Sequence, residues 1–262
     1  MDRRSMLKRS RHSVTEWNLL SQCPRAYEWT YIRPKTLFNN NVKNSNHTSK
    51  PSSVESRELG TEVHRCLELG DEEGLRKLDI QSESVLEWMH TSPLMKQAGR
   101  GREVWTELAF EVPLSDEVLV GSIDRLVCEN GRYQIIDFKV MAKEKSDAEL
   151  IKTYQTQLFL YAEALSILEP QAKNNTEIWI VVITTNGVRP KEVLEVRLPV
   201  SEQSVSEKSI SEDMIGASNQ IILGKQGQPK PSFRCRYCSF QSICEEGRAF
   251  FTSSPTSPGE VN

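Results

Sequence analysis

The sequence predicts a mixed α/β fold in which a central sheet is flanked by helices. Three short segments, 104–112, 118–128 and 133–140, are rich in apolar and β-branched residues and have the length of strands. A strongly amphipathic helix is expected at 147–168, because apolar residues recur there every three or four positions. Since further strands and a further helix follow, the order of elements indicates a layered α/β architecture.

The remaining elements surround these strands. Gly131 supplies a turn between the second and third strands. Two later strands are expected to pair across Asn186-Gly187, at 177–184 and 192–198. Helices are expected at four places, the first of them interrupted at Cys23-Pro24: 14–33, 59–69, 81–98 and 204–223.

Composition divides the chain of 262 residues into a core and appendages. A stretch rich in Asn, Ser and Lys has almost no apolar residues, which is typical of a flexible insertion. We expect six segments: a flexible basic start at 1–13, a helical segment at 14–38, the insertion at 39–58, the core at 59–224, a cysteine-rich segment at 225–248 and a disordered tail at 249–262.

Charge is unevenly distributed along the chain. The net charge is −3, yet residues 1–35 hold eight Lys or Arg against three Asp or Glu, and residues 224–248 hold five against two. Basic ends around an acidic middle suit a protein that holds phosphates at its ends, although scattered solvated charge gives the same pattern. The sequence contains no apolar run of 18 residues and no secretory signal, so we expect a cytoplasmic protein that does not enter a membrane.

Two acids and a lysine stand out in the expected strands. Asp124 follows an apolar half-strand in GSIDRLV, and Asp137 and Lys139 share one face of the next strand in YQIIDFKV. If the strands are neighbours, the three side chains converge. Two carboxylates form a hard oxygen site suited to Mg²⁺ or Mn²⁺, and a lysine beside them can offset charge on a phosphate.

Three further residues fit the same site. His64, on the expected helix in LGTEVHRCLELG, is a candidate third metal ligand, although a lone histidine on a helix is more often not a ligand. Gln157 and Tyr161 are four positions apart on the long helix and therefore share a face. Tyr161 also fits the apolar core stripe of that helix.

Taken in order, His64, Asp124, Asp137-x-Lys139 and Gln157-x-x-x-Tyr161 resemble the motifs of the RecB-like branch of the PD-(D/E)XK nucleases. The resemblance implies a restriction-endonuclease-like fold. It also implies that His64, Asp124 and Asp137 hold the metal, that Lys139 acts beside it, and that the Gln157 helix supports the site. Glu107, in TELAFEVPL, resembles the acidic residue that these enzymes carry on the preceding strand.

The six cysteines include a close group near the end of the chain: Cys235, Cys238 and Cys244 in FRCRYCSFQSIC. A C-x-x-C pair can reach one metal centre, and Cys23, in CPRAYEW, is the best candidate for a fourth ligand. Cys66 and Cys128 lie in apolar patterns and are expected in the core. Spacing alone allows either zinc or an iron–sulfur cluster.

The arrangement of one distant N-terminal cysteine with a C-terminal C-x2-C-x5-C resembles the iron–sulfur nucleases, which include the CRISPR-associated adaptation exonucleases and the nuclease domain of AddB. This resemblance implies a [4Fe–4S] cluster on Cys23, Cys235, Cys238 and Cys244. Four arginines flank these cysteines and are expected to contact DNA: Arg25, Arg33, Arg234 and Arg236.

Together these features predict a metal-dependent exonuclease that acts on single strands or ends of DNA. Two alternatives remain open: a nuclease subunit that works with a helicase or with CRISPR adaptation proteins, and a non-catalytic iron–sulfur subunit that binds DNA. Because the chain has no Walker A motif, any helicase motor belongs to another protein.

Overall fold

The fold of the chain is described from a computed structural model. The structure describes residues 11–35, 53–78, 80, 82–114, 117–141, 145–185, 193–198 and 210–253. The chain forms two compact units, here called the sheet unit (Met1–Val14 and Ser45–Ser211) and the cysteine unit (Thr15–Asn44 and Glu212–Asn262). Most of the expected flexible segments at 1–13, 39–58 and 249–262 lies outside the described residues.

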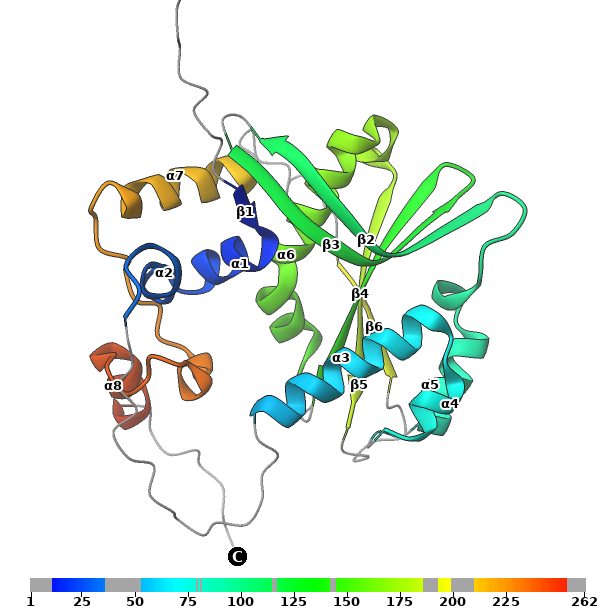
Figure 1. The fold of residues 1–262 in the computed structure, drawn as a ribbon, viewed down its shortest axis with the longest axis horizontal. Helices are drawn as coiled ribbons and strands as arrows, with labels where there is room; N and C mark the ends of the chain where they lie inside the picture. Colours follow the sequence, from blue (N-terminus) through cyan, green and yellow to red (C-terminus); the bar gives the residue numbers. More distant parts are fainter. Residues whose placement is uncertain are drawn as a thin grey trace, which may run out of the picture. The chain divides into compact units, whose positions relative to one another are not determined.

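The sheet unit contains a mixed six-stranded sheet with the order β1-β3-β4-β5-β6, in which β2 also pairs with β3 (Figure 1). The pairs β1–β3 and β4–β5 are parallel, and the pairs β2–β3, β3–β4 and β5–β6 are antiparallel. The strands are β1 (Arg11–Ser13), β2 (Arg102–Leu114), β3 (Glu117–Glu129), β4 (Arg132–Met141), β5 (Thr176–Thr184) and β6 (Val193–Arg197).

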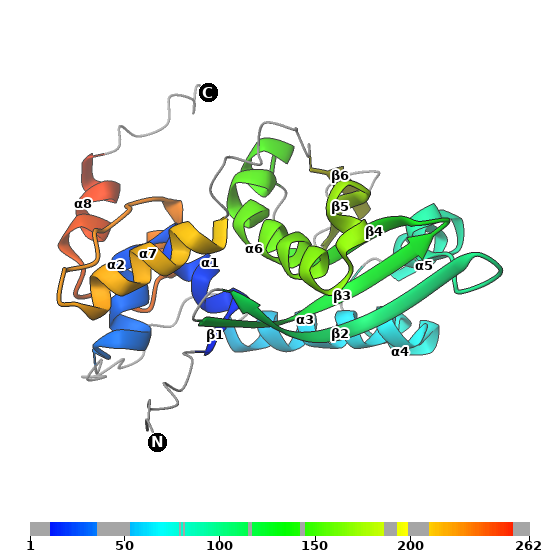
Figure 2. The ribbon, with the colours of Figure 1, turned by 90° about the horizontal axis from the view of Figure 1, so that it is seen from above.

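Helices cover both faces of this sheet. The long helix α6 (Asp147–Leu168) lies on one face, and α3 (Ser53–Leu69) and α4 (Glu72–Arg76) lie on the other (Figure 2). Ser146 caps α6: its hydroxyl accepts a hydrogen bond from the Glu149 N–H, and the Glu149 carboxylate accepts one from the Ser146 N–H. This capping box fixes the start of the helix where the sequence predicts it.

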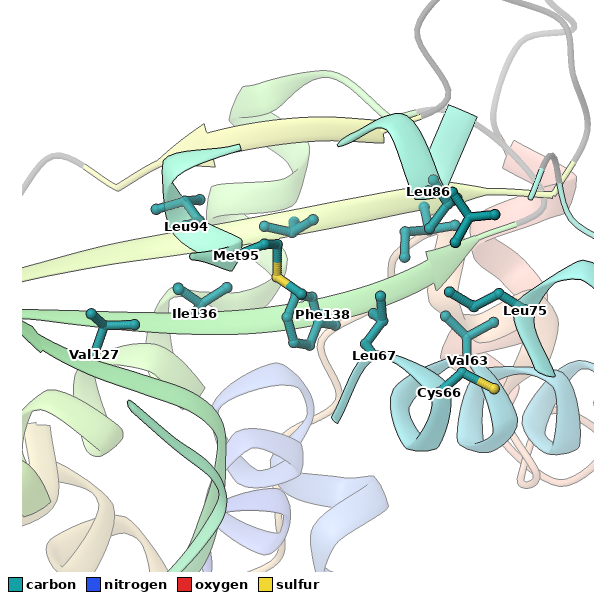
Figure 3. Packing of buried hydrophobic residues seen from close by; sticks show 13 residues of the cluster. Val63, Cys66, Leu67, Leu75, Leu86, Leu94, Met95, Val127, Ile136 and Phe138 are labelled. Atoms are coloured by element: carbon teal, nitrogen blue, oxygen red, sulfur yellow. The ribbon is translucent and has the colours of Figure 1, made fainter. Parts of the chain in front are cut away.

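The main apolar core lies between the sheet and α3, α4 and α5 (Ser82–Thr91) (Figure 3). Ile136 and Phe138 of β4 point into it, together with Val63 and Leu67 of α3. Because side chains alternate along a strand, Asp137 and Lys139 point to the opposite face, toward α6. The apolar residues of β4 therefore fix the direction of its two charged residues.

A short turn beside this core is held by two buried arginines. Arg125 is 1% exposed and donates hydrogen bonds to the carbonyl oxygens of Leu94 (3.1 Å), Met95 (3.3 Å) and Lys96 (3.0 Å) at the 3-10 turn η2 (Pro93–Met95). Arg102 donates to the Pro93 carbonyl oxygen at 2.9 Å. Burial is the main reason that the pKa of Arg125 falls to about 10.

The cysteine unit is built from segments near both ends of the chain. From the first part come α1 (Val14–Gln22), α2 (Pro24–Tyr27) and the π-helical turn η1 (Glu28–Ile32). From the second part come α7 (Ile210–Ile222), the 3-10 turn η4 (Phe233–Tyr237) and α8 (Glu245–Ser253). The Tyr27 hydroxyl lies 2.7 Å from the Ser218 hydroxyl, so α2 and α7 are joined by a buried hydrogen bond.

The structure confirms the predicted α/β class with a mixed sheet between helices. The helix at 147–168 has the predicted bounds, and the two C-terminal strands pair as expected. The helix predicted at 81–98 ends instead at Thr91, because Pro93 cannot continue it. Among the described residues, no helix is both long enough and apolar enough to cross a membrane.

Candidate active site

The candidate site begins where β3 and β4 separate. On one edge of β3, residues 125–129 pair with β4 and residues 118–120 pair with β1. Asp124 lies between these two paired stretches, and its Oδ2 accepts a hydrogen bond from the Phe138 backbone N–H at 2.8 Å. The two strands are neighbours, the condition on which the predicted convergence depended, and their pairing brings Asp124 beside the Asp137-x-Lys139 segment.

Glu107 enters the site from the other edge of β3. The β2–β3 register runs through Thr106↔Arg125 and Leu108↔Ile123 but omits the Glu107–Asp124 pair between them. Glu107 has φ of 44°, a left-handed backbone conformation that is rare for residues other than glycine. Such a conformation costs about 1 kcal/mol or more, and it occurs where the carboxylate of Glu107 approaches Asp124.

His64 reaches the same place from α3. Its Nδ1 lies 3.6 Å from Asp124 Oδ2, and its ring meets the Phe138 ring edge-on with centroids 6.0 Å apart. Burial and the positive charge of Lys139 lower the pKa of His64, which keeps the imidazole neutral. A neutral imidazole has the free lone pair that a metal ligand requires.

These three side chains form a set that can hold a cation. One ligand atom from each of His64, Glu107 and Asp124 lies within 4.8 Å of the others. Two carboxylates and an imidazole suit a divalent ion such as Mn²⁺ or Mg²⁺. This group of three candidate ligands includes Glu107. The sequence indicated Glu107 only because it resembles the acidic residue that RecB-like nucleases carry on the preceding strand.

Asp137 lies beside this set and is held by other partners. It is fully buried; Lys139 Nζ lies 2.5 Å from its Oδ2, and the Gln157 amide donates to its Oδ1 at 3.1 Å. The same amide donates to the Tyr161 hydroxyl at 2.9 Å. The structure therefore joins four predicted site residues, Asp137, Lys139, Gln157 and Tyr161, through one ion pair and two hydrogen bonds.

Electrostatics indicate that the site carries excess negative charge. Burial, and then repulsion from Asp137, raise the pKa of Asp124 to about 7. Burial alone would disfavour a charged Lys139, but Asp137 and Asp124 outweigh it and raise the pKa of that lysine. The pKa of Tyr161 is also raised, first by burial and then by Asp137. A divalent cation would relieve the repulsion between the carboxylates, so the donor set fits a metal.

The cysteine unit contains a second cluster of residues of a type that can bind metal. Cys23, Cys235, Cys238 and Cys244 line one pocket together with Trp29 and Phe240, whose rings pack edge to face with centroids 5.4 Å apart. Burial, and then the neighbouring cysteines, raise the pKa of the Cys238 thiol. The four cysteines are thus gathered from both ends of the chain around one space.

Spacing and hydrogen bonds characterise this pocket further. Tetrahedral zinc places its sulfur ligands about 3.8 Å apart. Within the described residues, no three of these cysteine sulfurs all lie within 4.8 Å of one another. The Sγ atoms of Cys235 and Cys244 each accept a backbone N–H at 3.4 Å, from Ser232 and Gly247. Four thiolates around one pocket are a donor set that could hold either zinc or an iron–sulfur core.

Two of the four predicted DNA-binding arginines, Arg25 and Arg33, make contacts within the cysteine unit that can be described in detail. Arg25 donates to both carboxylate oxygens of Glu246 at 2.7 Å. Arg33 lies 2.9 Å from Glu28 and donates to two backbone carbonyls near the end of α7. Arg234 and Arg236 are exposed on η4. The first pair of arginines therefore has a structural task whether or not it also contacts DNA.

Sequence reasoning missed one residue that shapes the cysteine unit. A Cβ atom at Gly227 would lie 2.3 Å from the Pro24 carbonyl oxygen, so only glycine allows this approach of the two backbones. The Gly227 N–H also donates to the buried Glu28 carboxylate at 2.6 Å. A lone glycine between Gln226 and Gln228 gives no signal of this in the sequence.

Comparison with known proteins gives one family and several similar folds. The family model of the PD-(D/E)XK nuclease superfamily matches residues 11–245. Among solved structures, a proposed exonuclease from Eubacterium rectale is similar with a TM-score of 0.50 and 12% identity, over 94% of this chain and 89% of that one. The crystal structure of SSO0001 is 17% identical with a TM-score of 0.44, over 93% and 90%. No curated protein sequence matches this chain.

Proposed function

Because the chain belongs to the PD-(D/E)XK nuclease superfamily, we propose that it is a Mg²⁺- or Mn²⁺-dependent deoxyribonuclease that acts on single strands or ends of DNA. The observation that carries this proposal is the convergence of His64, Glu107 and Asp124 beside the Asp137–Lys139 pair. The exonuclease mode follows the resemblance of the motifs and agrees with the name of the Eubacterium rectale protein.

Each residue of the site has a task in this proposal. His64, Asp124 and Asp137 would hold the metal, and Glu107 would join them. A cation at this site would supply Lewis-acid chemistry, polarising the scissile phosphate and making the attacking water more acidic. Lys139 keeps its proton because Asp137 and Asp124 raise its pKa, so its ammonium can donate to a phosphate oxygen.

Gln157 and Tyr161 have a supporting task. The Gln157 amide donates to both Asp137 and the Tyr161 hydroxyl, so it fixes the direction of the Asp137 carboxylate. Tyr161 is buried against the Phe110 ring, with centroids 6.0 Å apart, which prevents it from turning away. Loss of either residue should therefore disturb the carboxylate rather than remove a ligand.

The proposal gives the cysteine unit a [4Fe–4S] cluster on Cys23, Cys235, Cys238 and Cys244, as in the RecB-like iron–sulfur nucleases. Four cysteines around one pocket, and backbone N–H groups directed at two of the sulfurs, support it. The cluster would add to the fold, since it joins segments roughly 210 residues apart. The proposed DNA contacts are Arg25, Arg33, Arg234 and Arg236.

A second candidate function is a nuclease subunit that works with a helicase or with CRISPR adaptation proteins. The same site residues would act in both cases, because a nuclease subunit of a complex cleaves DNA by the same chemistry as a nuclease that works alone. A non-catalytic iron–sulfur subunit that binds DNA is disfavoured, since every proposed catalytic position holds a competent residue.

The decisive assay follows end-labelled single- and double-stranded DNA in Mn²⁺, Mg²⁺ or EDTA. Wild type should degrade at least one of these substrates with either metal and none with EDTA. Release of single nucleotides from the label would support an exonuclease, and internal fragments would support an endonuclease. Cleavage at full rate in EDTA would rule out the metal-dependent mechanism.

A further inference from the structure

Tyr154 lies on α6 beside the site, and the chemistry outlined so far gives it no task. It is three residues before Gln157 and seven before Tyr161, so the three side chains share one face of the helix. The Lys139 Nζ lies 5.2 Å from the centroid of the half-buried Tyr154 ring. This distance is within the range at which an ammonium is attracted to an aromatic face.

Lys139 needs such a second contact because of its neighbour. Its ammonium lies 2.5 Å from Asp137 Oδ2, on a four-carbon stem that can adopt many conformations. If a cation neutralises Asp137, the attraction that holds Lys139 becomes weaker. The ring of Tyr154 attracts the ammonium independently of that carboxylate. The N–H groups of the ammonium can still donate hydrogen bonds to a phosphate oxygen.

We propose that Tyr154 is a positioning residue, whose ring holds the Lys139 ammonium at the site while a cation and a phosphate are bound. This inference rests on the proposed nuclease function and concerns the ring rather than the hydroxyl. A second lysine, Lys145, lies 6.0 Å from the same ring. Replacing Lys145 therefore shows whether the ring acts through Lys139 or through Lys145.

The test compares four variants with wild type in single-turnover cleavage at saturating DNA and Mn²⁺. Tyr154→Phe keeps the ring, Tyr154→Leu and Tyr154→Met remove it, and Lys145→Met removes the second lysine. DNA affinity and melting temperature are measured for each variant. These readouts separate a loss of positioning from a loss of binding or folding.

The ring-less variants should cleave about fivefold to tenfold more slowly with unchanged DNA affinity, the size expected for one partly buried cation–π contact. Tyr154→Phe and Lys145→Met should stay within about twofold of wild type, because the ring and Lys139 remain.

Several results would overturn the inference. Wild-type rates in both ring-less variants would do so, as would a Phe variant as slow as the Leu variant. A Lys145→Met variant that reproduces the loss would move the effect to that lysine, and unfolding of both ring-less variants would give the ring a structural role. If wild type cleaves DNA, these failures leave the proposed function intact. A wild type that cleaves nothing would overturn the proposed function itself.

Discussion

The sheet unit and the cysteine unit each bring together side chains of types that can bind metals, but by different means. In the sheet unit, Asp124 and Asp137 lie on strands whose direction is fixed by pairing and by an apolar core. In the cysteine unit, segments far apart in sequence meet through polar contacts, such as Arg25 with Glu246 and Gly227 with Glu28. Losing a ligand should therefore cost activity in the first unit and structure in the second.

The largest effect on structure is expected from Cys23→Ser. Loss of one thiolate from a site that is coupled to folding should release both segments of the cysteine unit and remove bound iron. Protein purified without oxygen should lose its brown colour, and limited proteolysis should cut near residues 15–30 and 225–250. Cys66→Ala and Cys128→Ala are matched controls and should keep the colour.

Two results would contradict this prediction. A Cys23→Ser variant with full iron content would remove Cys23 from the ligand set. Wild-type protein that is colourless and holds one zinc ion would exclude the iron–sulfur cluster but keep the cross-link between the segments.

A smaller loss is expected from Gly227→Ala. The added methyl group would meet backbone atoms of Pro24 and Arg25, which cannot move as a side chain can, so the cost should be about 1–3 kcal/mol or more. Chemical denaturation followed by fluorescence of Trp17 and Trp29 measures it. Gly216→Ala, on α7 with no atom within 4 Å of the new Cβ, is the control and should be neutral or stabilising. Equal stabilities would show that the close approach is not needed.

In the sheet unit, Glu107→Gln should weaken the metal site without harming the fold. Removing one of two carboxylates from the set should raise the Mn²⁺ concentration needed for half-maximal cleavage by roughly tenfold. Glu103→Gln, an exposed residue on the same strand, is the control. A Glu107→Gln variant with wild-type Mn²⁺ dependence would mean that the left-handed backbone of Glu107 does not serve metal binding.

The smallest effect is a pH dependence of metal binding. Burial and Asp137 raise the pKa of Asp124 from 3.8 to about 7, so the folded protein keeps a proton that the unfolded chain releases near pH 4. The metal-free protein should therefore lose stability as the pH rises from about 4 to about 7. Because a cation must displace this proton, the rise in melting temperature caused by Mn²⁺ should be greater at pH 8 than at pH 6. Asp124→Asn should abolish the difference, and a Mn²⁺ effect independent of pH in wild type would contradict this account.

Sequence patterns predicted the parts of the fold with clear periodicity. The strands around Asp124 and Asp137 and the whole of α6 were expected, since each combines an apolar pattern with a sufficient length. The strand β1, of three residues, and the helix α4, of five, are too short to show a period. The helix α8 was also missed, because its sequence adjoins the cysteine group and carries few apolar residues.

The candidate site was predictable to a similar degree. The residue types and their order indicated His64, Asp124, Asp137 and Lys139, and the structure brings them close together. The left-handed backbone of Glu107 could not be expected, because glutamate has no preference for that conformation. Contacts that depend on tertiary approach, such as the Tyr154 ring beside Lys139, have no local signal in the sequence.

The proposed function requires the hard-metal site of the sheet unit to perform the cleavage. The most direct measurement is the single-turnover rate of DNA cleavage by Asp124→Asn in saturating Mn²⁺, beside wild type and the exposed control Asp147→Asn. We expect Asp124→Asn to lose about a thousandfold or more in rate, with an unchanged or higher melting temperature of the metal-free protein. The control should cleave at the wild-type rate. A folded Asp124→Asn variant that cleaves at the wild-type rate would contradict the proposed function.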